Sequence, residues 1–148
     1  MLQKVGLFAS ITGDTTLENI VIAETSSITA THKFASAGAV VGEIANGSSC
    51  TIRNCENHAD LIGSGPKDDS FASKYANVGG IVGNANGNIL VLNCRNYGSV
   101  NLTIPSENHA GGITGRQNSM VLLAGCVNYG EVSAASAAMS SYFPTNGS

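Results

Sequence analysis

Hydrophobic and polar residues alternate with a period of two through most of the chain, which is the pattern of short β-strands. Runs rich in Ile, Val, Leu and Thr are separated by Gly and Asn, residues that tolerate tight turns. The 3.6-residue period of a helix does not appear in any long segment. The sequence therefore predicts an all-β protein.

The same pattern recurs as four copies of one unit. The copies begin alike at Val5, Ala37, Val78 and Ala110, so the unit is 32 residues long, with an expansion to 41 in the second copy. A second signature follows in the later copies: Asn54-Cys55-Glu56-Asn57-His58-Ala59, Asn93-Cys94-Arg95-Asn96-Tyr97-Gly98 and Gly125-Cys126-Val127-Asn128-Tyr129-Gly130. We assign repeats at 5–36, 37–77, 78–109 and 110–141 within one domain, 1–148. That the chain is a fragment of a longer array stays open.

Each repeat divides into three predicted strands, and the parity of the apolar positions changes between the second and the third. That change predicts a corner at Asn19, Asn54, Asn93 and Gly125. The first strand has an inward column of large apolar residues: Phe8, Val40, Ile81 and Ile113. Three short strands per repeat predict a parallel β-solenoid (β-helix) of about four coils, whose equivalent residues stack about 4.8 Å apart. A propeller is disfavoured because its blades need more strand per repeat and show aromatic signatures.

The third copy carries the clearest motif, Gly79-Gly80-Ile81-Val82-Gly83 followed by Asn93-Cys94-Arg95-Asn96-Tyr97-Gly98. It resembles the GLUG-type repeats of bacterial cell-surface proteins, adhesins and the non-catalytic regions of IgA-protease-like proteins. The resemblance covers nearly the whole chain and is weakest in the first copy, where Ile20 replaces Cys and Glu24 replaces Gly. It implies a secreted or cell-surface module that acts in adhesion or as a structural spacer, and it supplies no catalytic residues.

Composition narrows the classes of partner. Only 11% of residues are charged, the net charge is -3, and Lys and Arg number seven, which leaves no basic stripe for nucleic acid. No run of about 18 apolar residues is present, so we expect no membrane insertion through a helix. The expected partners are a host protein, a neighbouring surface protein or a glycan. We also expect end-to-end self-association, because Leu2, Val5 and Leu7 begin the first coil without an evident cap.

Three columns of the second signature have a structural interpretation. Cys55, Cys94 and Cys126 share an inward column, and we expect buried free thiols there and at Cys50 rather than a metal site. The Asn column is expected to be an amide ladder that satisfies itself from coil to coil; its members are Asn57, Asn96 and Asn128. The next column faces outward and is expected either to bind a partner or sugar or to stack structurally; its members are His58, Tyr97 and Tyr129.

The expansion in the second copy concentrates charged and aromatic residues in an otherwise weakly charged chain. Insertions in repeat proteins often form the binding face, although a tolerated surface loop is the simpler interpretation. The candidate binding residues are Lys67, Asp68, Asp69, Phe71, Lys74 and Tyr75.

The sequence fits the known arrangements of catalytic residues poorly. His32, His58 and His109 have no nucleophile placed beside them by a motif, and the acidic residues occupy mostly different repeat positions. We therefore expect a non-enzymatic module with no cofactor, no catalytic residue and no metal. The alternative is the scaffold of a polysaccharide-acting parallel β-helix enzyme, which would require carboxylates or basic residues converging on one groove.

Overall fold

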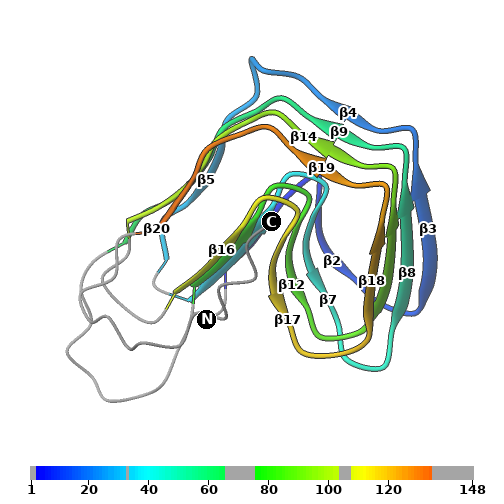
Figure 1. The fold of residues 1–148 in the computed structure, drawn as a ribbon. Coiled ribbons are helices and arrows are strands. Elements are labelled where there is room, and N and C mark those ends of the chain that lie inside the picture. Colours follow the sequence, from blue (N-terminus) through cyan, green and yellow to red (C-terminus); the bar gives the residue numbers. More distant parts are fainter. Residues whose placement is uncertain (1–2, 33, 66–75, 104–107, 135–148) are drawn as a thin grey trace, which may run out of the picture.

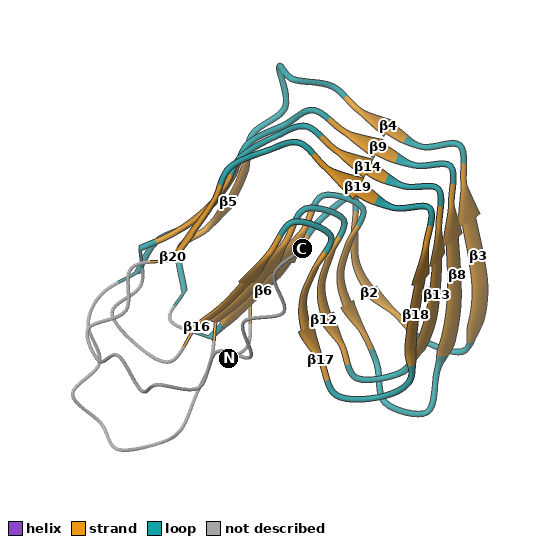
Figure 2. Cartoon of the chain, viewed as in Figure 1, coloured by secondary structure: helices purple, strands orange, loops and turns teal. Residues whose placement is uncertain are grey.

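The computed structural model describes residues 3–32, 34–65, 76–103 and 108–134, which form four stacked coils of a parallel β-solenoid (Figure 1). The described residues contain no helix (Figure 2), and hence no helix that could cross a membrane. Equivalent strands of successive coils pair in parallel in five four-stranded sheets. The predicted fold class is confirmed.

The five strands of each coil follow one another around the solenoid. The first coil contains β1 (Gln3–Val5), β2 (Phe8–Ile11), β3 (Asp14–Glu18), β4 (Val21–Ile22) and β5 (Ile28–Ala30). The second contains β6 (Ala35–Gly38), β7 (Val41–Ile44), β8 (Ser49–Arg53), β9 (Glu56–Asn57) and β10 (Leu61–Gly63). The third contains β11 (Ala76–Gly79), β12 (Val82–Ala85), β13 (Asn88–Leu92), β14 (Arg95–Asn96) and β15 (Val100–Leu102). The fourth contains β16 (Asn108–Gly111), β17 (Thr114–Gln117), β18 (Val121–Ala124), β19 (Val127–Asn128) and β20 (Val132–Ala134).

The prediction of three strands per coil is wrong, because two of the predicted strands are each broken by a turn. The first divides at the glycine-rich turn into pairs such as β11 and β12, and the third divides after the Asn column into pairs such as β14 and β15. Period-two patterning continues through the turn after the Asn column, and β11 and β12 are buried at every position, so the sequence pattern reveals neither break.

The glycine-rich turn points into the coil and separates two apolar clusters. Strands β16 and β17 run side by side, and the turn between them reaches toward β19 (Figure 1). Val40 and Ile81 belong to the cluster between the second and third sheets in chain order, whereas Ala39 and Val78 belong to the cluster against β5, β10 and β15. The core of this solenoid is therefore two parallel apolar columns divided by backbone.

Close backbone packing explains why glycine recurs in this turn. A Cβ atom added to Gly83 would lie 2.6 Å from the Ala37 nitrogen and 2.6 Å from the Gly42 carbonyl oxygen, in the neighbouring coil. A Cβ on Gly80 would overlap the side chain of Asn96. These glycines are required for space between packed strands.

Phe8 departs from the predicted inward column. Val40 and Ile81 are fully buried, but Phe8 is 37% exposed. Val5 pairs with Ala37 and Phe8 pairs with Val41, so the first turn is one residue shorter than the second. The shorter turn, in a coil covered on one side only, leaves the Phe8 ring partly in solvent.

Candidate functional site

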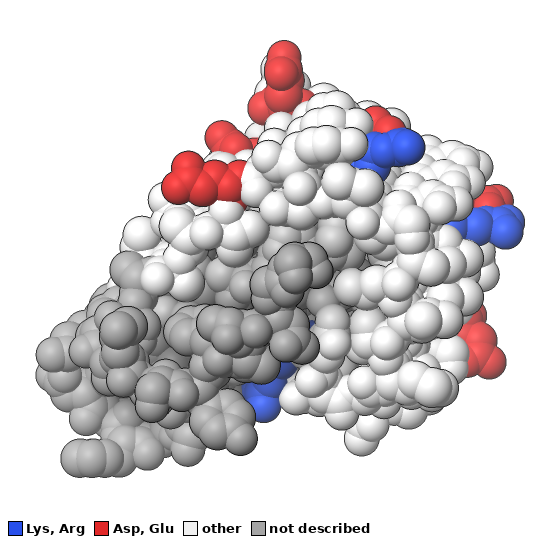
Figure 3. Space-filling model, in the orientation of Figure 1, with Lys and Arg blue, Asp and Glu red and all other residues white. Residues whose placement is uncertain are grey.

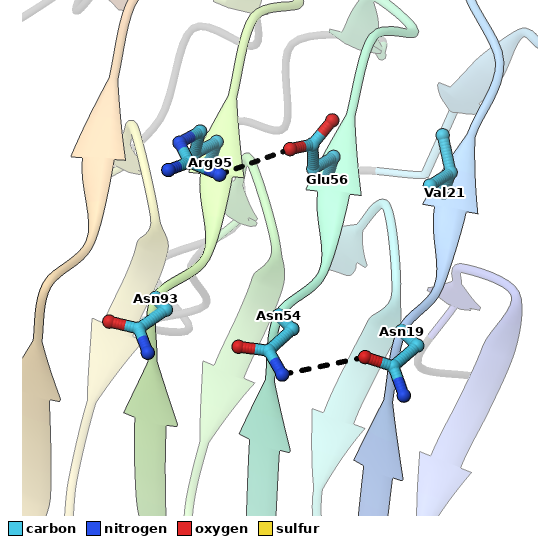
Figure 4. Close-up of a pocket in the computed structure, with 6 residues that line it drawn as sticks. All are labelled: Asn19, Val21, Asn54, Glu56, Asn93 and Arg95. Atoms are coloured by element: carbon cyan, nitrogen blue, oxygen red, sulfur yellow. Dashed lines mark hydrogen bonds and ion pairs between the residues drawn. The ribbon is translucent and has the colours of Figure 1, made fainter.

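The predicted corner is confirmed, and its residues adopt the left-handed (αL) backbone conformation. Asn19, Asn54 and Asn93 have φ angles of 57°, 53° and 51°, and Gly125 has 64°. Asn and Gly adopt this left-handed conformation more readily than other residues. Each residue ends the long third strand of its coil and turns the chain into the next strand, so the three Asn side chains form a column on the outside of the corner (Figure 4).

A shallow groove of about 620 Å³ runs across this corner. Its second wall is the column two residues further on, where Val21, Glu56 and Arg95 project from β4, β9 and β14 (Figure 4). Arg95 Nη1 lies 3.2 Å from Glu56 Oε1, and Asn54 Nδ2 lies 3.4 Å from Asn19 Oδ1. The groove thus presents planar amide, carboxylate and guanidinium groups at fixed spacing.

A column of rings lies on the far side of the ionic column. The His58 and Tyr97 rings stack with centroids 4.5 Å apart, and the Tyr97 and Tyr129 rings stack at 5.0 Å, with both pairs close to parallel. The rings cover one another's faces and direct their edges to solvent, and both tyrosines are exposed. Three outward columns therefore lie side by side, which we call the corner face: the Asn19, Asn54 and Asn93 amides, the Val21, Glu56, Arg95 and Val127 side chains, and the His58, Tyr97 and Tyr129 rings.

The asparagine ladder beneath the rings is confirmed. Asn57 Nδ2 donates to Asn96 Oδ1 at 2.7 Å, and Asn96 Nδ2 donates to Asn128 Oδ1 at 2.8 Å. Each amide also donates to the backbone carbonyl two residues later, for example Asn96 Nδ2 to Gly98 O at 2.8 Å. Asn57 and Asn96 are fully buried. The ladder fixes the corner face from below and is not itself available to a ligand.

The cysteine column lies inside the corner, and all four thiols are free. Cys50, Cys55 and Cys94 are buried in the apolar cluster, whereas Cys126 in the last coil is partly exposed. Burial, together with the nearby Cys55, raises the pKa of the Cys50 thiol to about 11. The pKa of Cys94 is raised by its hydrogen bond with Cys55 and by burial.

We expect a single fast-reacting thiol in the folded protein. At pH 8 a disulfide reagent such as Ellman's reagent will modify Cys126 first, because burial shields the other three thiols. The raised pKa of Cys50 also keeps that thiol protonated. The hydrogen bond with Cys94 lowers the pKa of Cys55, but Cys55 is fully buried and out of reach of the reagent. The C126A variant will lose the fast phase, and all remaining thiols will react in urea. Two or more fast phases in the folded protein would contradict the placement of the cysteine column.

Charged groups are sparse on the surface. Figure 3 shows few Lys, Arg, Asp and Glu side chains on the face in view, and some of the basic side chains lie beside acidic ones. Among the described residues no group of three or more His, Cys, Asp or Glu side chains lies close enough to hold a metal ion. His109 lies in strand β16, with Nδ1 3.0 Å from Asn77 Oδ1.

The candidate residues in the second-copy expansion lie outside the described residues: Lys67, Asp68, Asp69, Phe71, Lys74 and Tyr75. Sequence reasoning identified the aromatic column but missed the groove beside it. The signal that could have indicated the groove is the column between the Cys and Asn columns. Its residue type changes from coil to coil along the stack: Val21, Glu56, Arg95 and Val127.

Comparison of the chain with protein-family models, with curated proteins and with solved structures finds no match. The geometry of the corner face and the repeat pattern are therefore the observations that bear on function.

Proposed function

We propose that the chain is a non-enzymatic repeat module of a bacterial surface protein, in which the solenoid presents the corner face to a host protein, a neighbouring surface protein or a glycan. The observation that supports this proposal is the corner face. Its three outward columns are held at the spacing of the coils by the αL corner residues and by the buried asparagine ladder. Side chains that are already held in place lose little conformational entropy when they bind a partner. The resemblance to GLUG-type repeats supports a location outside the cell.

The chemistry of the groove favours binding over catalysis. Glycoside hydrolysis usually requires two carboxylates facing the scissile bond. Glu56 is the one carboxylate among the six residues that line the groove, and it contacts both Arg95 at 3.2 Å and His58 at 3.3 Å. Both of its carboxylate oxygens therefore contact side chains of the corner face, and no second carboxylate lies beside it among the residues that line the groove. These contacts support the adhesion role over the enzyme scaffold.

The test is binding of the purified chain to an array of glycans and extracellular proteins. R95A/Y97A should weaken binding at least about tenfold by removing the cation and a central ring. Loss of an exposed ion pair costs about 1 kcal/mol or less, so the variant should remain folded. The matched control is N101A, an exposed position on β15 away from the corner.

A second variant tests the alternative binding site, the expansion in the second copy. Replacing residues 65–75 with a short Gly/Ser turn removes the expansion and leaves the corner face intact. Binding that survives this replacement and is lost in R95A/Y97A supports the corner face. Binding lost only with the replacement of residues 65–75 would assign the site to that segment, and no binding by the parent chain would leave a structural spacer as the function.

A further inference from the structure

The amide column of the corner face has more hydrogen-bonding groups than the fold uses. Asn19, Asn54 and Asn93 are all exposed. In the described part of the chain one hydrogen bond joins them, from Asn54 Nδ2 to Asn19 Oδ1 at 3.4 Å, and the Asn93 side chain makes none. Each amide carries both donor hydrogens and an acceptor oxygen, so the column presents groups of both kinds to solvent (Figure 4).

The backbone of the corner does not require these amides. Gly125 occupies the same position in the fourth coil and has the same left-handed conformation, with a φ of 64° compared with 51° at Asn93. Glycine adopts this conformation without help from a side chain. The three amides are therefore available to a ligand.

The charges on the two sides of the amide column cancel. Directly before the column, Glu18 pairs with Arg53 of the next coil. Directly after it, Glu56 pairs with Arg95 of the next coil, with Oε1 and Nη1 3.2 Å apart. Neither pair leaves an excess of one sign, so these side chains do not attract a highly charged chain at long range.

We propose that the groove binds a neutral, hydroxyl-rich glycan whose sugar units lie along the first three coils; this assignment rests on the binding role proposed above for the corner face. A sugar hydroxyl both donates and accepts hydrogen bonds, so it can pair with either polar atom of an amide. It can also donate to the Glu56 carboxylate or accept from the Arg95 guanidinium while the ion pair stays in place. An amide column repeated at coil spacing suits a chain of repeated units better than a single sugar.

A protein partner fits the groove less well. Protein interfaces have an apolar core, and their strongest contacts are large side chains in desolvated pockets. Val21 is the one apolar side chain among the six residues that line the groove. The faces of the Tyr97 ring beside the groove are covered by His58 and Tyr129. A shallow polar groove of about 620 Å³ therefore favours a hydrated ligand with many hydroxyl groups.

The array of glycans and extracellular proteins gives the first result, and its bound members should be neutral linear glycans. Calorimetric titration then compares the tightest neutral oligosaccharide with oligogalacturonate of equal length. Raising NaCl from about 0.1 M to about 1 M shortens the Debye length from about 10 Å to about 3 Å, yet the affinity for the neutral ligand should change less than about twofold. The disaccharide of the same sugar should bind at least about tenfold more weakly, because it spans fewer amides.

Substitution by glycine removes the amides and keeps the turn. N54G/N93G reproduces the situation at Gly125, so the variant should remain folded, and it should weaken binding of the neutral glycan roughly tenfold. The matched control is N46G, which removes an exposed amide from the turn before β8, at the opposite end of that strand from Asn54. N46G should leave the affinity unchanged. Far-UV circular dichroism and melting of each variant establish that weaker binding does not come from unfolding.

Several outcomes would overturn the neutral-glycan assignment. Tighter and salt-sensitive binding of oligogalacturonate, or binding of a protein and no glycan, would do so and leave the binding role of the corner face in place. Equal affinity of N54G/N93G and the parent chain for the neutral glycan would show that the amides make no contact with it. Absence of binding to every member of the array would contradict the proposed function and the assignment together.

Discussion

Replacing Gly83 with alanine should destabilise the solenoid by about 3 kcal/mol, because the new methyl group has no space. Its Cβ would lie 2.6 Å from two backbone atoms of the second coil, Ala37 N and Gly42 O, and 2.7 Å from Ala37 C. Backbone cannot rotate away as a side chain can, so β12 must move away from β6 and β7. Thermal unfolding should show a drop in Tm of about 10 °C.

The matched control changes a glycine that has open space around it. A Cβ on Gly47 would meet nothing within 4 Å, and the φ of 76° at this position is one that Asn tolerates. G47N should therefore change the free energy of unfolding by about 0.5 kcal/mol or less. Equal losses in G83A and G47N would show that the glycines serve turn conformation alone and that the inward turn is not packed against its neighbours.

Replacing Asn96 with aspartate should destabilise the protein by about 3 kcal/mol at neutral pH. The Asn96 amide donates to Gly98 O and Asn128 Oδ1 and accepts from Asn57 Nδ2. The substituted carboxylate keeps the shape and the acceptor but loses both donors, and it puts a charge in a fully buried position. Urea titration of N96D against the parent chain measures the loss.

The pH dependence of N96D separates the cost of the buried charge from the cost of the lost hydrogen-bond donors. Burial raises the pKa of the introduced carboxyl in the folded state above its unfolded value. The penalty is therefore smallest below the unfolded pKa of about 3.9, where the group is protonated in both states, and it grows as pH rises toward the folded pKa. The difference in stability between N96D and the parent should shrink at low pH. A constant difference would contradict the buried amide ladder.

An exposed asparagine provides the control for N96D. Asn101 lies in β15 with its side chain in solvent, so N101D makes the same chemical change without burial. It should alter the free energy of unfolding by about 0.5 kcal/mol or less.

The columns of the solenoid could be predicted because stacking in register imposes the same environment on equivalent residues. The Asn96 ladder, the Asn93 corner and the Tyr97 ring column follow from repeat position and parity alone. Parity specifies which face a side chain occupies, and the repeat specifies its neighbours above and below.

Features formed between different parts of a coil could not be predicted in this way. The Gly83 packing brings β12 against β6 of the neighbouring coil, which is not its equivalent strand. Glycine recurs at this position as Gly42 and Gly115, but the recurrence alone does not indicate which strand the glycine packs against. The groove likewise arises where the corner asparagines meet the Glu56 and Arg95 column, and residue identity changes from coil to coil there. The two additional strands in each coil were not predicted because the turn after the Asn column keeps the period of two, and the strands on both sides of the glycine-rich turn are buried at every position.

Four coils stack in parallel with equivalent side chains in contact. Side-chain amide protons in a nuclear Overhauser spectrum test this most directly. The structure predicts cross-peaks between Asn57 and Asn96 and between Asn96 and Asn128, with none between Asn57 and Asn128. Absence of the two sequential contacts, or a contact between Asn57 and Asn128, would contradict the stacked solenoid.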